Sequence, residues 1–243
     1  MKASISLYAI FIFALLAVVP VSAAPCSTTQ YDMMNWFAMA PSWATDHHLT
    51  GSANPLYTYR GNTFYWVKGP SGYPWDVNTY DSNYVYQWRT EYVWSDPTSY
   101  KAFDSPMPWS PRCVNRPPTG IFGSRLAAIM VPSPRYTIYG GDCGATSTNK
   151  LGYVVNEIWG PTRMSLGGSL PNNALTLTLS YRYNCSSSYS DCKYKETFDF
   201  QRPYGLVRWI YFILQYGQYV QQTQSVFNNL VDGGSPEPNH PCW

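Results

Sequence analysis

The chain has 243 residues, of which only 12% are charged, and its formal net charge is +2. So small an excess of positive charge gives no bulk attraction for a polyanion, which argues against nucleic acids and anionic membrane surfaces as partners. Aromatic residues reach 17%, with 22 Tyr and 10 Trp. Because aromatic rings stack on the C–H faces of sugars, this composition favours a poly- or oligosaccharide as the partner.

Residues 1–23 are predicted to be a secretory signal peptide. Lys2 precedes an apolar run over residues 5–19, and small residues lead up to Ala23, which is the pattern that signal peptidase recognises. The run is shorter than the roughly 20 residues that a membrane span needs. We therefore expect a secreted protein, extracellular or periplasmic, with no membrane span after cleavage and with residues 24–243 forming one domain.

Six cysteines follow this signal, and an even number in an exported chain predicts disulfide bonds. They are Cys26, Cys113, Cys143, Cys185, Cys192 and Cys242. The short serine-rich stretch between Cys185 and Cys192 predicts a bond that closes a hairpin tip. We further expect Cys26 to pair with Cys242, which leaves Cys113 for Cys143. Paired C-x-x-C units are absent from the sequence, so we expect no metal and no cofactor.

In chain order, the predicted elements are one short helix followed by strands. The helix is expected within residues 31–40. Alternation of apolar and polar residues then predicts strands at 56–59, 63–68, 84–94 and 151–159, and a four-stranded antiparallel meander over 175–183, 194–200, 204–214 and 219–227. The predicted fold class is all-β: a two-sheet antiparallel β-sandwich, jelly-roll-like and stabilised by disulfides.

The strand over residues 84–94 carries an aromatic residue at nearly every second position. We expect this aromatic face to pack in the core, because six large side chains seldom stay exposed in one row. The polar residues Gln87, Arg89 and Glu91 would then line an open face and bind a ligand. In the opposite arrangement the rings would be the binding platform.

Glutamates are few, which narrows the candidates for catalysis. A glycoside hydrolase needs two carboxylates across a cleft. Glu196 shares a strand face with Tyr194 and Phe198, and Glu157 shares one with Trp159. These two glutamates and Glu91 are therefore candidate catalytic residues. The structural alternative is an ion pair with Arg182 or Arg208.

Two stretches resemble strands of the jelly-roll alginate lyases. These are "WRTEYVW", which contains Arg89 and Glu91, and "QYGQYVQQ", which contains Tyr219 and Gln221. The resemblance implies that Arg89 holds a uronate carboxylate and that Tyr219 exchanges protons in β-elimination. It adds Gln221 to the candidate ligand-binding residues. Trp159 is a further candidate, because it belongs to "NEIW", the segment at the position of the family's histidine-containing strand.

Three functions stay open at this point. The favoured one is a secreted glycan-binding or surface protein without a catalytic site. The first alternative is a polysaccharide-degrading enzyme, either a lyase or a glycoside hydrolase of the β-sandwich class. The second alternative is a structural envelope protein.

Overall fold

The computed structural model describes residues 26–37, 62–67, 74–93, 96–139, 145–168, 170–202 and 204–226. Of residues 62–67, 74–77, 79, 88–93, 96–100 and 225 it describes the backbone alone. These residues form 14 strands and one helix of four residues, α1 (Met34–Phe37), which is too short to cross a bilayer. The helix falls inside the segment predicted to be helical. The predicted signal peptide lies outside the described residues.

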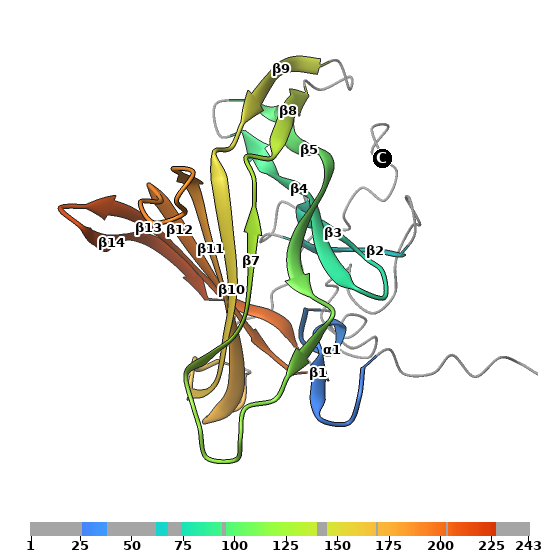
Figure 1. Ribbon diagram of the computed structural model, residues 1–243, viewed down its shortest axis with the longest axis vertical. Helices are drawn as coiled ribbons and strands as arrows, with labels where there is room; N and C mark the ends of the chain where they lie inside the picture. The colour runs from blue at the N-terminus through green and yellow to red at the C-terminus, as the bar shows by residue number, and fades with distance from the viewer. Residues whose placement is uncertain are drawn as a thin grey trace, which may run out of the picture.

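Two six-stranded antiparallel sheets make up most of the fold (Figure 1). The first sheet has the order β2 (Asn62–Val67), β3 (Pro74–Tyr80), β4 (Tyr84–Val93), β5 (Asp96–Pro111), β8 (Arg135–Tyr139) and β9 (Ala145–Lys150). The second sheet has the order β7 (Ser124–Val131), β10 (Tyr153–Met164), β11 (Ala174–Cys185), β12 (Tyr194–Gln201), β13 (Gly205–Gln215) and β14 (Gln218–Val226). A third, two-stranded sheet pairs β1 (Gln30–Asp32) with β6 (Cys113–Asn115).

The predicted all-β class is confirmed, and so is the C-terminal meander. Strands β10 to β14 follow one another both in the chain and in the second sheet. The turn from β13 to β14 consists of Tyr216 and Gly217, which both have positive φ angles, as a two-residue hairpin requires. A jelly roll would instead send consecutive strands to alternate sheets, and this strand order does not confirm that finer expectation.

Aromatic rings from three parts of the chain meet in the core between the sheets. Phe37 of α1 lies 4.5 Å from Phe200 of β12 and 5.8 Å from Trp109 of β5, measured between ring centroids. Trp109 in turn meets Phe198 edge to face at 5.1 Å. A partly buried hydrogen bond also joins the sheets, because the Asn156 amide of β10 donates to the carbonyl of Pro108 in β5 at 2.9 Å. The helix and both sheets therefore share one core.

The start of strand β4 faces the opposite way from our expectation. Val85 and Gln87 are 0% and 1% exposed, whereas Tyr84 is 38% exposed and the Tyr86 hydroxyl donates to Asp81 at the surface. Alternation fixes which residues share a face, but packing decides which face is buried, and here β5 supplies the large core rings. Gln87 is thus a core residue and not part of an open polar row.

The described disulfides confirm one predicted pairing and correct the other two. Cys185 is bonded to Cys192, as predicted, while Cys26 is bonded to Cys113 and not to Cys242. The reason is the pairing of β1 with β6, which brings the two segments together and is extended by hydrogen bonds such as Arg116 N to the Thr29 carbonyl at 3.0 Å. Cys143 and Cys242 lie outside the described residues.

The two disulfides are expected to contribute unequally to stability. Cys26 and Cys113 are 87 residues apart, and Cys185 and Cys192 only seven. In the chain-entropy account, replacing the first pair by serine lowers the free energy of unfolding by about 4 to 5 kcal/mol, and replacing the second lowers it by about 2 kcal/mol. Urea unfolding of the two double variants tests this order. Equal losses of unfolding free energy would contradict it.

Candidate functional site

Glu157 lies on the outer face of the second sheet, the face turned away from the first sheet. Its neighbour Ile158 belongs to the core, so alternation sends Glu157 outward. The Glu157 carboxylate is 8% exposed, accepts a hydrogen bond from Arg125 at 3.0 Å and forms an ion pair with Arg182 at 3.3 Å. The structural ion pair with Arg182, weighed above as an alternative to catalysis, is therefore present.

Lys195 and Tyr219 continue this charged row across the outer face. The Lys195 ammonium lies 5.1 Å from the centroid of the Phe212 ring and 5.5 Å from that of Tyr219. Burial, and then the charge of Arg182, lower the pKa of Lys195. Burial raises the pKa of Tyr219, whose hydroxyl donates to the Cys192 carbonyl at 2.9 Å. That hydroxyl is thus held by the disulfide loop.

The site residues predicted from the sequence do not lie together. They are on both sheets, and within the second sheet they are on both faces. Arg89 and Glu91 lie on β4 of the first sheet, and the described structure does not include their side chains. Tyr219 lies on β14 of the second sheet, so the two residues that the lyase resemblance pairs are on strands of different sheets. Trp159 is half-buried on β10, and Gln221 is exposed opposite Phe212.

Glu196 lies on the inner face of the second sheet, opposite to Glu157. Ser180 of β11 is the cross-strand partner of Glu157 on one side and of Thr197 on the other. Directly paired residues point to the same face and successive residues to opposite faces. The carboxylates of Glu157 and Glu196 are therefore separated by the sheet, and the pair suggested for glycoside hydrolysis is not brought together.

A row of stacked rings surrounds Glu196, and we refer to it as the aromatic ladder. It consists of Tyr181, Tyr183, Tyr194, Tyr211 and Trp209. The ring centroids are 4.7 to 6.3 Å apart from one ring to the next, and the planes differ by at most 33°. The ladder crosses β11, β12 and β13. It begins at Tyr181, a buried core residue, and continues the core face of the second sheet to the half-buried rings of Tyr194, Tyr211 and Trp209.

Glu196 lies within this ladder and is held by its members. In the strand register it is opposite Tyr181 on one side and Tyr211 on the other. Its carboxylate accepts the indole N–H of Trp209 at 2.6 Å. Burial raises the pKa of Tyr183 well above 10, and the nearby charge of Glu196 and a hydrogen bond to it add to the shift. The indole N–H of Trp209 and the O–H of Tyr183 therefore help to stabilise this half-buried carboxylate.

Sequence reasoning singled out Glu196 and Tyr194 but missed Tyr183, Tyr211 and Trp209. The available signal was the recurrence of aromatic residues at every second position in three consecutive meander strands, which places their rings on one face. Among the described residues no three His, Cys, Asp or Glu side chains are close enough together to hold a metal ion. The chemistry that the ladder offers is thus stacking and hydrogen bonding.

We expect the Glu157→Gln variant to lose about 3 kcal/mol of unfolding free energy, because it leaves the half-buried Arg182 without its carboxylate. The matched control is Arg125→Gln. The Arg125 side chain is 57% exposed, and a partner so close to solvent should cost less than about 1 kcal/mol. Denaturant unfolding at neutral pH measures both. Equal losses would contradict the structural role assigned to the Glu157–Arg182 pair.

Stability should fall at high pH through Tyr183. Its pKa in the folded protein lies well above the ordinary value of 10.0, so its contribution is complete below about pH 10 and is lost as the pH rises toward the folded-state pKa. The Tyr183→Phe variant should therefore show a shallower loss of unfolding free energy between about pH 9 and about pH 11.5. Identical slopes for the two proteins in urea unfolding would refute the shift.

Both predicted catalytic carboxylates whose side chains are described have protein partners. Glu157 is engaged by two arginines, and Glu196 is held by Trp209 on the other face of the sheet. Comparison with models of known protein families, with curated proteins and with solved structures gives no match.

Proposed function

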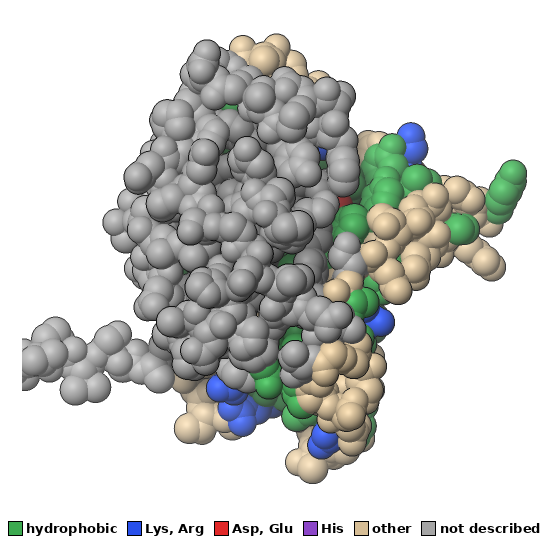
Figure 2. All heavy atoms as spheres, turned by 180° about the vertical axis from the view of Figure 1, so that it is seen from behind, with side chains coloured by type: hydrophobic (Ala, Val, Ile, Leu, Met, Phe, Trp, Pro, Cys, Tyr) green, Lys and Arg blue, Asp and Glu red, His purple; other side chains and the backbone are tan. Residues whose placement is uncertain are grey.

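We propose that this is a secreted glycan-binding protein and that the aromatic ladder is its binding face. The observation that carries the proposal is the row of near-parallel rings around Glu196. Tyr194, Tyr211 and Trp209 are half-buried, so part of each ring is open to a ligand. Figure 2 shows hydrophobic side chains gathered on the projecting part of the second sheet.

The spacing of the rings suits a saccharide. Tyr211 is 6.2 Å from Tyr194 and 6.3 Å from Trp209, measured between ring centroids. At this separation near-parallel rings do not cover each other fully, which leaves ring surface for the C–H face of a sugar. The tyrosine hydroxyls and the carboxylate of Glu196 add the hydrogen-bonding groups that fix the orientation of sugar hydroxyls.

The charges around the ladder favour a neutral sugar. Glu196 supplies one negative charge, and the Lys193 ammonium, 5.1 Å from the centroid of the Tyr194 ring, supplies one positive charge. These two formal charges of the described residues are opposite in sign. Secretion is part of the proposal, and the predicted signal peptide and the two disulfides support it.

The test is a glycan array followed by calorimetry with the best neutral oligosaccharide. We expect Tyr211→Ala to reduce its affinity about tenfold, because the variant removes the central ring of the ladder. The matched control is Tyr216→Ala, which removes a fully exposed tyrosine at the β13–β14 turn and should bind like the unmodified protein. The proposal fails if no neutral glycan binds, or if both variants bind equally well.

A further inference from the structure

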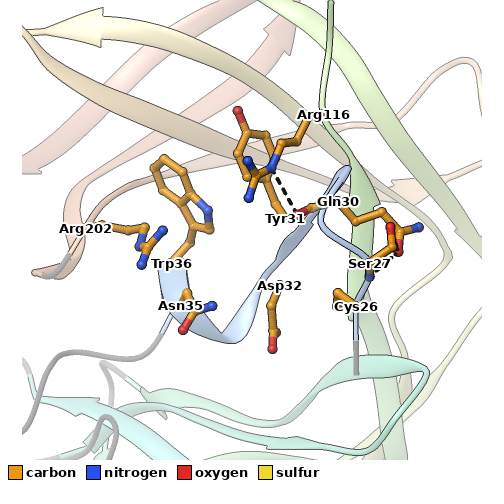
Figure 3. A pocket seen from close by; sticks show the side chains of 9 residues that line it. All are labelled: Cys26, Ser27, Gln30, Tyr31, Asp32, Asn35, Trp36, Arg116 and Arg202. Atoms are coloured by element: carbon orange, nitrogen blue, oxygen red, sulfur yellow. Dashed lines mark hydrogen bonds between the residues drawn. The ribbon is translucent and has the colours of Figure 1, made fainter. Parts of the chain in front are cut away.

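A pocket lies where β1 and α1 meet the ends of β11 and β12 (Figure 3). Its inner part has a volume of about 180 Å³ and is lined by Tyr31, Trp36, Arg116 and Arg202, among others. It adjoins a wider hollow of about 480 Å³ that shares these four residues and extends to Leu175. The aromatic ladder contributes no residue to either space, so a site in this pocket does not rest on the proposed function.

The pocket carries a surplus of positive charge. Asp32, its one acidic lining residue, is neutralised by Arg112, whose Nε and NH2 groups donate to the two carboxylate oxygens at 2.6 and 3.0 Å. Arg116 and Arg202 form no ion pair with any carboxylate of the described chain. Two guanidinium groups therefore line one small space with no counter-charge of their own.

Arg116 is held in place while part of its guanidinium is left for a ligand. Its Nε donates to the Gln30 carbonyl at 3.1 Å, the contact drawn as a dashed line in Figure 3, and its Cζ lies 5.1 Å from the centroid of the Tyr31 ring. Its terminal nitrogens have no described acceptor. A guanidinium fixed in this way is suited to a planar or tetrahedral oxyanion.

Trp36 supplies an independent observation that points to a ligand. Its side chain is 4% exposed, and its indole N–H is buried without an acceptor in the described structure. The ring is fixed edge to face against Tyr31 at 5.6 Å, and Figure 3 shows the indole nitrogen turned toward the space between the labelled side chains. Buried donors in folded proteins nearly always have a partner, and an oxygen atom of a ligand in this pocket is a suitable acceptor.

We propose that this pocket binds an acidic sugar residue. Its carboxylate or sulfate group lies in the inner part, between Arg116 and Arg202, and accepts the indole N–H of Trp36. The inner part, of about 180 Å³, has room for such an acidic group. The sugar ring occupies the wider hollow, where Tyr31 and Leu175 offer apolar surface.

The experiment follows the indole N–H resonance of Trp36 by two-dimensional NMR during titrations at constant ionic strength. The probes are methyl glucuronide for a carboxylate, glucose 6-sulfate for a sulfate, and methyl glucoside as the neutral counterpart. We expect one or both acidic sugars to shift the resonance in a saturable way and the neutral sugar to leave it unchanged. No saturable shift with either acidic sugar would overturn the proposal.

Variants separate the pocket from general charge effects. The Arg116→Gln/Arg202→Gln double variant should weaken binding at least tenfold, while Arg135→Gln, which removes an exposed arginine of β8, should not. Tyr211→Ala, which disrupts the ladder, should leave this signal unchanged, so the two proposals fail separately. Equal weakening by Arg135→Gln, or equally tight binding of sodium acetate and sodium sulfate, would refute an acidic-sugar site here.

Discussion

The ring contacts of Phe37 with Phe200 and Trp109 hold this fold together, because they join the N-terminal segment to both sheets at one point. Buried aromatic side chains contribute more apolar area than any other residue type, and the described part of the chain has few buried ion pairs to add. Each candidate binding site includes a residue of the same core cluster, Tyr181 in the ladder and Trp36 in the pocket. The ladder extends the same sheet face outward, and Trp36, next to Phe37, forms a wall of the pocket.

The second sheet separates two physical roles by its two faces. On the outer face, Glu157 with its two arginines and the disulfide loop at Cys185 tie neighbouring strands to each other. On the inner face, the same strands present the ladder around Glu196. Because alternate residues belong to opposite faces, the strands can be stiffened by charged contacts on one side without placing those charges among the rings on the other.

Much of the fold could be predicted from the sequence, but the faces and long-range pairings could not. Period-two patterning predicted the C-terminal meander, and seven residues of separation predicted the Cys185–Cys192 bond. Periodicity does not determine which face of a strand is buried. The sequence pattern therefore predicts an open face for Gln87, although this residue lies in the core. The Cys26–Cys113 bond depends on the β1–β6 pairing, which is set by tertiary contacts between segments far apart in the chain.

The Cys26–Cys113 bond also has a consequence for recognition. It clamps the two segments that supply Tyr31 and Arg116, and backbone hydrogen bonds between them reinforce the clamp. The groups that would meet a ligand are thereby ordered before it arrives. Binding to such a surface loses little conformational entropy, because the side chains and backbone are already in place. A bond that stabilises the fold thus also preorganises the pocket, so that even a small ligand can be held by a few contacts.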